Sequence, residues 1–260
     1  YPAKGNAVTY VAETLKISNK ESFKWIVKKY GLKTSDAKLS AGFAEEDAEE
    51  LADSLRELTP AQDFRDNIAY VAAKLPVVKG EGIEDVVYVI TSTREKFRLN
   101  DEELYKRRLY AARHPYPDPR WSVGAIRKFL ASDKRVDITW AFSLVKSRLE
   151  YYIDFGDENW HNCIACWIIG TYFHRLFESY PYVFLNGNAE SGKTKTLTLC
   201  SLLAFNGELT FNSTPSFITA AVHENSSSCF VDEAERLKNS SDPSAQIVVS
   251  MMNAGYKKGT

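Results

Sequence analysis

The sequence predicts a mixed α/β protein: a mostly helical first part with a small β-hairpin, then a second part in which strands and helices alternate. Three observations support this fold class. Apolar residues recur at helical spacing through most of the first 175 residues. A short apolar run, Tyr182–Leu185, leads into a glycine-containing loop and a helix. A second apolar run, Ser228–Val231, ends at two acidic residues.

Composition restricts the classes of protein that the chain can belong to. Hydrophobic residues make up 44% of the 260 residues and charged residues 26%, as in globular proteins. A net charge of −1 means that any nucleic-acid binding must use a local basic patch. We find no signal-peptide pattern and no apolar run that could cross a membrane. The cysteines form no spaced disulfide framework, so we expect a cytoplasmic, reducing setting: Cys163, Cys166, Cys200 and Cys229.

The N-terminal residues predict a helical hairpin and a linker. Asn6 is placed to begin a first helix, and Ser18 with Glu21 forms a capping box at the start of a second one. Gly31 is placed to end that second helix. Residues 33–59 are rich in acidic side chains, so we interpret them as a solvated linker that passes into a helix.

The next segment predicts another helix and then a hairpin. Thr59 resembles a helix cap, and a helical stripe of apolar residues follows it as far as Leu75: Phe64, Ile68, Val71 and Leu75. Asp85–Thr91 is rich in β-branched and aromatic residues and predicts a strand, and Lys96–Leu99 is placed to pair with it. Asn100 is placed to cap a further short helix.

Basic and aromatic residues are interleaved between residues 106 and 135, and this pattern has two interpretations. Cations neutralise phosphates and rings stack on bases, which suits a DNA-binding surface. The alternative, which we favour from sequence alone, is a solvated helical surface with its rings turned inward. The candidate DNA contacts are Arg107, Arg108, Arg127 and Lys128, joined by Lys257 and Lys258 near the end of the chain.

Two long helices are predicted before the glycine-containing loop. The first spans Asp137–Tyr152, and the second spans Asp157–Phe177 and is expected to be buried around much of its circumference. The second helix contains Cys163 and Cys166 near a histidine. Because no second pair of ligands accompanies them, we favour buried apolar cysteines over a metal site.

Gly187–Thr194 matches the phosphate-binding pattern G-x-x-x-x-G-K-[ST] at every fixed position. The two glycines permit turns that point successive N–H groups at phosphate oxygens. Lys193 is expected to contact the β- and γ-phosphates of ATP, and Thr194 to bind Mg²⁺. The predicted nucleotide-binding residues are Gly187, Asn188, Ala189, Glu190, Ser191, Gly192, Lys193, Thr194 and Lys195.

The second apolar run delivers Asp232 and Glu233 at its carboxyl end, where open α/β sheets bind ligands. Asp232 is expected to hold the Mg²⁺ that Thr194 also binds, and Glu233 to polarise the attacking water. Glu233 and Lys193 are therefore the predicted catalytic residues, with ATP and Mg²⁺ as cofactors. Between the two motifs we expect a strand at Glu208–Phe211 and a helix that starts at Pro215.

Several segments after Leu149 resemble the AAA+, superfamily 3-like helicase module of primase-helicase replication proteins of plasmids, viruses and integrated elements. They include Trp167-Ile-Ile-Gly-Thr-Tyr-Phe-His, Tyr180-Pro-Tyr-Val-Phe-Leu-Asn-Gly and Asn253-Ala-Gly-Tyr-Lys-Lys-Gly. The resemblance implies a P-loop NTPase core, ring assembly as a homo-oligomer, commonly a hexamer, and ATP-driven movement on DNA. The opening residues, Lys4-Gly-Asn-Ala-Val-Thr-Tyr-Val and Glu21–Leu32, resemble the tail of a bacterial-type primase zinc-binding domain.

These features predict four regions: a primase-type tail at 1–32, an acidic linker at 33–59, an accessory region at 60–150 and the first part of the ATPase domain at 151–260. The chain stops at Thr260, before a sensor strand or a later arginine finger, so we expect the ATPase core to be truncated here. Two functions remain open at this point. One is an ATP-dependent DNA helicase module, and the other is a nucleotide-binding scaffold of a replication complex that does not hydrolyse ATP.

Overall fold

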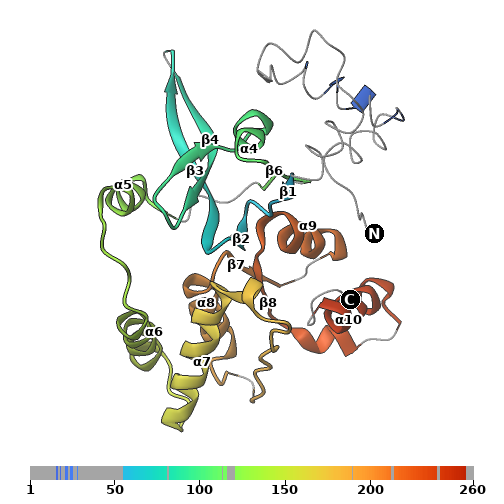
Figure 1. Ribbon diagram of the computed structural model, residues 1–260. Coiled ribbons are helices and arrows are strands. Elements are labelled where there is room, and N and C mark those ends of the chain that lie inside the picture. The colour runs from blue at the N-terminus through green and yellow to red at the C-terminus, as the bar shows by residue number, and fades with distance from the viewer. Residues whose placement is uncertain are drawn as a thin grey trace. The chain divides into compact units, whose positions relative to one another are not determined.

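The computed structural model describes residues 55–80, 82–112, 114–115, 121–188, 190–211, 214–238 and 241–255, with a few positions between 16 and 28. Helices and sheets are both present, which confirms the mixed α/β class (Figure 1). The chain divides into two compact units, Tyr1–Pro115 and Tyr116–Thr260. Within these described ranges, no helix has both the length and the apolar character that crossing a bilayer requires.

The described positions near the N-terminus confirm the predicted capping box. The Glu21 Oε2 accepts hydrogen bonds from the Ser18 backbone N–H at 3.0 Å and from its hydroxyl at 2.9 Å. In return, the Glu21 backbone N–H donates to the Ser18 hydroxyl at 3.3 Å. The rest of the predicted helical hairpin and most of the acidic linker lie outside the described residues.

The first unit contains a four-stranded antiparallel sheet in the order β2-β3-β4-β5. Figure 1 shows β3 and β4 as a long hairpin that continues past the shorter β2. A short helix, α4, follows the sheet, and its predicted cap is confirmed because the Asn100 side chain accepts from the Glu103 N–H. The elements are β2 (Gln62–Arg65), β3 (Ile68–Lys79), β4 (Gly82–Thr91), β5 (Lys96–Arg98) and α4 (Asp101–Lys106).

A small apolar core joins this sheet to α4, to β6 and to the segment that follows β1. Strands β1 (Arg56–Glu57) and β6 (Leu109–Tyr110) pair in parallel, which brings the two ends of the segment together. The buried side chains of this core come from the connecting segment, the sheet, the helix and β6: Leu58, Val89, Phe97, Leu104 and Leu109. The hairpin of β4 and β5 was predicted from the sequence and is confirmed.

The helix predicted from Thr59 to Leu75 is wrong, and with it the expectation of a mostly helical region before residue 100. This segment instead forms β2 and β3, which meet at a two-residue turn where Asp66 and Asn67 have φ angles of 50° and 62°. Positive φ at both turn residues suits the twist of a β-hairpin. β3 also pairs with β4 over most of its length, from Tyr70 opposite Thr91.

The second unit contains most of the helices and a two-stranded parallel sheet of β7 and β8, which are connected through α9. The predicted helix starts are confirmed, since Asp137, Asp157 and Thr214 each accept a backbone N–H of the helix that follows. The elements are α5 (Val123–Ala131), α6 (Ile138–Tyr152), α7 (Glu158–Thr171), η1 (His174–Leu176), α8 (Lys193–Leu203), β7 (Gly207–Thr210), α9 (Pro215–Asn225), β8 (Ser228–Val231), η2 (Ala234–Lys238) and α10 (Pro243–Gly255).

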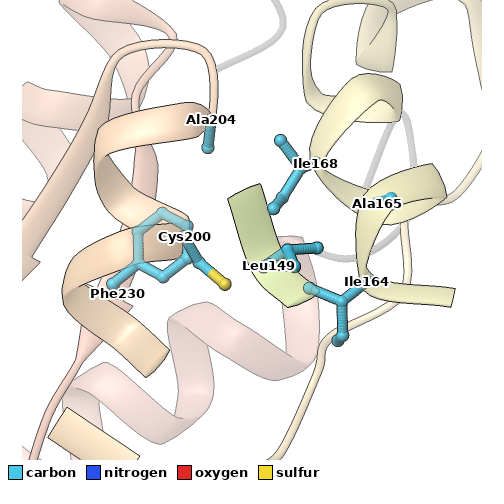
Figure 2. Packing of buried hydrophobic residues seen from close by; sticks show 7 residues of the cluster. All are labelled: Leu149, Ile164, Ala165, Ile168, Cys200, Ala204 and Phe230. Carbon is cyan, nitrogen blue, oxygen red and sulfur yellow. The ribbon is translucent and has the colours of Figure 1, made fainter. Parts of the chain in front are cut away.

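A single buried cluster holds α6, α7, α8 and β8 together. Figure 2 shows Leu149 of α6 between side chains of α7 and side chains of α8 and β8. Leu149, Ala165 and Ile168 are completely buried. Burying a leucine or isoleucine side chain such as Leu149 or Ile168 contributes about 1.5–3 kcal/mol to folding. The cluster therefore fixes α8, and the loop that precedes it, against the two preceding helices.

The segment Tyr182–Leu185 is not a strand, contrary to prediction. It has no regular secondary structure, and the side chains of Val183 and Phe184 are exposed. A strand needs a neighbour to accept and donate its ladder hydrogen bonds, and none of the described strands pairs with this run. Side chains hold its start instead: the Trp167 indole donates to Pro181 O at 2.8 Å, and the Tyr182 hydroxyl donates to Met252 O at 2.8 Å.

The predicted burial of α7 is also only partly correct. Residues His161, Ile164, Ala165 and Ile168 form its buried stripe. Cys163 and Cys166 lie on the opposite side and are exposed, so the prediction of buried cysteines at these two positions is wrong. The helical period explains the difference, because a helix that packs on one side exposes residues at i and i+3 on the other.

Candidate functional site

The two glycines of the loop before α8 have different surroundings. Gly192 has φ +83°, in the left-handed region that L-residues with a side chain rarely adopt. A Cβ atom at Gly187 would lie 2.7 Å from the Ser191 hydroxyl, so that side chain would have to move to make room for it. The loop also turns at Glu190, with φ +63°. The backbone thus folds back on itself immediately before the helix begins at Lys193.

Lys193 lies inside this turn. Its ammonium group donates to the carbonyl oxygens of Gly187 and Asn188, both at 2.7 Å. These partners are neutral, so the lysine satisfies hydrogen bonds without meeting a carboxylate there. The first N–H groups of a helix also lack intrahelical partners and carry partial positive charge. A cation and a helix N-terminus therefore meet at one place, which suits an anion.

The two sequence motifs meet through one hydrogen bond. The Thr194 hydroxyl donates to Asp232 Oδ2 at 2.7 Å, although the two residues are 38 positions apart. β8 positions the aspartate, and its backbone N–H continues the parallel ladder by donating to Thr210 O at 2.9 Å. The core cluster positions the threonine, because Cys200 of the same helix is buried in it. The predicted proximity of these side chains is thus present.

Glu233 follows Asp232 at a sharp turn of the chain. Its φ is +56°, and its backbone N–H donates to Asp232 Oδ1 at 2.9 Å. This bond restrains the aspartate, since its other carboxylate oxygen accepts from Thr194. Glu233 itself is exposed to solvent. The turn therefore orders the carboxylate of Asp232, which accepts one hydrogen bond on each oxygen.

The donor set at this place suits a magnesium ion held partly by a ligand. Mg²⁺ prefers oxygen ligands and commonly takes only one or two from protein, with phosphate and water supplying the rest. Thr194 and Asp232 provide one hydroxyl and one carboxylate within hydrogen-bonding distance of each other. Throughout the described residues, no group of three or more His, Cys, Asp or Glu side chains could hold a metal ion alone. Cys163 and Cys166 are among the residues that belong to no such group.

The basic residues proposed as DNA contacts have different surroundings. Arg107 is held by Glu95 and Glu103 and stacks over the Phe97 ring. Arg108, Arg127 and Lys128 are exposed. Lys257 and Lys258, like Ala189 of the loop, lie outside the residues that the structure describes.

Sequence reasoning missed one aromatic residue near the loop. The Lys195 ammonium lies over the ring of Tyr152, 6.0 Å from its centroid. The contact joins the end of α6 to the first turn of α8, 43 residues later. No local pattern around Tyr152 signals it, because the proximity arises from the packing of α6 on the core.

Comparisons with protein-family models, with curated proteins and with solved structures found no match to this chain. The resemblance to replicative helicases therefore stays a prediction from sequence, and the geometry of the loop and of Asp232 carries the functional argument.

Proposed function

We propose that this protein binds ATP with Mg²⁺ at the loop Gly187–Thr194 and hydrolyses it. The observation that carries the proposal is the 2.7 Å hydrogen bond between Thr194 and Asp232. A hydroxyl at the start of a helix and an aspartate at the end of a strand are the two protein ligands that P-loop NTPases use for Mg²⁺. Their meeting in space supports a P-loop NTPase core more strongly than either motif does alone.

Each residue has a distinct role in this proposal. Lys193 neutralises charge on the β- and γ-phosphates, replacing its two carbonyl partners with phosphate oxygens. Thr194 and Asp232 hold Mg²⁺, which offsets the negative charge that develops on the phosphates during transfer. Glu233 accepts a proton from the attacking water as a general base. The backbone N–H groups of the loop orient the phosphate chain.

We further propose that hydrolysis drives movement on DNA by a homo-oligomeric ring. The support is the sequence resemblance after Leu149, together with the exposed cations Arg108, Arg127 and Lys128. The alternative is a nucleotide-binding scaffold that does not hydrolyse ATP. Binding uses Lys193, Thr194 and Asp232, whereas turnover also needs Glu233. A change at Glu233 should therefore stop hydrolysis without weakening nucleotide binding.

Isothermal titration with MgATP tests the binding part of the proposal. We expect Asp232→Asn to lower the affinity for MgATP roughly 10- to 100-fold, because it removes a charged metal ligand. Glu235→Gln is the matched control, since this neighbouring carboxylate is exposed in η2 and should leave affinity unchanged. Equal affinity in Asp232→Asn and wild type would show that Asp232 does not hold the metal.

Steady-state hydrolysis, with and without DNA, tests the catalytic part. We expect Glu233→Gln to bind MgATP as wild type does and to lose at least roughly 100-fold in turnover, as loss of a general base predicts. A wild-type protein that binds MgATP without any turnover would instead favour the scaffold function.

A further inference from the structure

We propose that Tyr152 is the residue that binds the nucleobase, by stacking its ring on the base of a nucleoside triphosphate held in the loop. The inference rests on the proposed function, because the loop must first hold the phosphates. It adds the part of the ligand that the two motifs leave unassigned. Neither Gly187–Thr194 nor Asp232 provides a flat apolar surface for a base.

The position of Tyr152 is fixed by the core. Leu149 lies three residues earlier on α6, one turn away, and is completely buried in the cluster that also contains Cys200 of α8 (Figure 2). The end of α6 is held as well. The Ile153 carbonyl lies 2.9 Å from His161 Nε2, which must donate because a carbonyl only accepts. The ring of the buried His161 in turn packs against Phe155. The backbone that carries Tyr152 is therefore restrained on both sides of it.

Tyr152 also lies next to the phosphate-binding turn. The Lys195 ammonium is 6.0 Å from the centroid of its ring, and Lys195 is the third residue of α8, directly after Lys193 and Thr194. In the proposed function Lys193 and Thr194 engage the β- and γ-phosphates and Mg²⁺. The nucleoside must leave the phosphate chain from its α end. Tyr152 contacts the side chain of Lys195 from that first helical turn, so its ring is the aromatic group to which we assign the nucleoside.

The ring remains available to a ligand. Tyr152 is 46% exposed, although it is a large aromatic residue attached to a core helix. Its neighbour Tyr151 meets it nearly at right angles, with an interplanar angle of 82° and centroids 4.8 Å apart. Nucleobases stack on aromatic rings that are held in place and partly exposed, because every base has a π-face. Lys195, whose ammonium lies 6.0 Å from the centroid of the Tyr152 ring, comes from the helical turn that starts at Lys193.

The test compares MgATP with magnesium tripolyphosphate, which has the phosphates but no nucleoside. Titration calorimetry of the full chain measures both affinities. We expect Tyr152→Ala to weaken MgATP binding by roughly 5- to 100-fold, the effect of removing one base–aromatic stack, and to leave tripolyphosphate binding unchanged. Tyr152→Phe keeps the ring and should bind both ligands as wild type does.

A second variant gives a direct signal. In Tyr152→Trp, MgATP should quench the indole fluorescence by stacking, whereas tripolyphosphate should not, after subtraction of the wild-type signal from the native tryptophans. Unchanged MgATP affinity in Tyr152→Ala overturns the inference, and so does an equal loss for both ligands, which would mean that the ring only supports the loop. Wild-type protein that binds the two ligands equally well overturns the base contact but keeps the phosphate site. Wild-type protein that binds neither overturns the proposed function itself.

Discussion

Arg107 in the first unit and Lys193 in the second are both cations with well-defined partners, and the partners differ in charge. Arg107 donates from Nε to Glu95 at 3.0 Å and from Nη1 to Glu103 at 2.9 Å, and its guanidinium lies 4.0 Å from the Phe97 ring centroid. Burial acts to lower the pKa of Arg107, but the hydrogen bonds to Glu95 and Glu103 outweigh it and raise that pKa. Lys193 donates to two neutral carbonyl oxygens.

A cation that stabilises the fold therefore differs in its partners from one that can bind an anion. The charge of Arg107 is already compensated by two carboxylates that belong to the same unit, so it contributes mainly to the stability of that unit. The charge of Lys193 is solvated by backbone dipoles next to a helix N-terminus, which an anion can replace at little cost. The sequence alone placed both residues among candidate ligand contacts, and their partners separate them.

The largest expected effect is on Lys193. We expect Lys193→Ala to lower ATP hydrolysis roughly 100- to 1,000-fold, because it removes a charged donor from the site of developing negative charge. The free energy of unfolding should change by less than about 0.5 kcal/mol, since neither of its partners becomes a buried unpaired charge. Phosphate release and denaturant unfolding measure the two quantities. Hydrolysis at the wild-type rate would remove the distinction drawn here.

The reciprocal substitution should affect stability instead of binding. We expect Arg107→Ala to lower the free energy of unfolding of the first unit by about 1–2 kcal/mol, since its side chain is only 26% exposed and has two acidic partners and a ring contact. MgATP affinity should stay the same. Urea unfolding followed by far-UV circular dichroism measures the change in stability.

Arg108→Ala is the matched control for that variant, because Arg108 is the adjacent and exposed arginine. It should change stability by less than about 0.5 kcal/mol. If Arg107→Ala weakens DNA binding and leaves stability intact, Arg107 belongs to a DNA surface and its ion pairs are incidental.

The smallest expected effect concerns the thiols of the second unit, which differ in burial as the two cations differ in their partners. Burial raises the pKa of Cys200 to about 12, and burial together with Glu208 raises that of Cys229 to about 11. Cys163 and Cys166 are exposed. Because the thiolate is the reactive form, we expect a disulfide reagent at pH 8 to modify two thiols rapidly and two slowly. Replacing Cys163 and Cys166 by alanine should remove the rapid phase. Four thiols reacting at one rate would contradict this burial pattern.

The same pKa values give the sign of a stability change with pH. The pKa of Cys200 is higher in the folded chain than the ordinary value of 9.0, so the unfolded chain loses its proton first as the pH rises. The contribution of the buried thiol to stability is therefore complete below about pH 9 and is lost as the pH rises towards 12. In Cys200→Ala this part of the alkaline dependence should disappear from urea unfolding measured under reducing conditions.

Features that depend on a few neighbouring residues were predictable from the sequence. The caps at Asn100, Asp137 and Thr214 are present because a side-chain acceptor satisfies N–H groups two or three residues away. The β4–β5 hairpin and the strand β8 follow from short runs rich in apolar and β-branched residues. The phosphate-binding pattern was equally local.

Other features depended on segments that are distant in the sequence. The spacing of apolar residues after Thr59 suits a helix, but pairing with β4 and a turn at Asp66 and Asn67 make the segment a sheet. Tyr182–Leu185 has the composition of a strand and lacks a paired neighbour among the described residues. In each case the sequence did not show which other segment of backbone would pair with the run.

The residue types of the loop were readable from the sequence alone: two glycines, a lysine at the start of the helix and a hydroxyl beside it. Only the tertiary structure decided that Asp232 meets Thr194, that Tyr152 lies beside Lys195 and that Arg107 is held by acidic residues. The physical reason is the sequence separation over which each interaction acts. Backbone conformation and capping are set within a few residues, whereas these contacts depend on how the buried faces of separate helices and strands pack together.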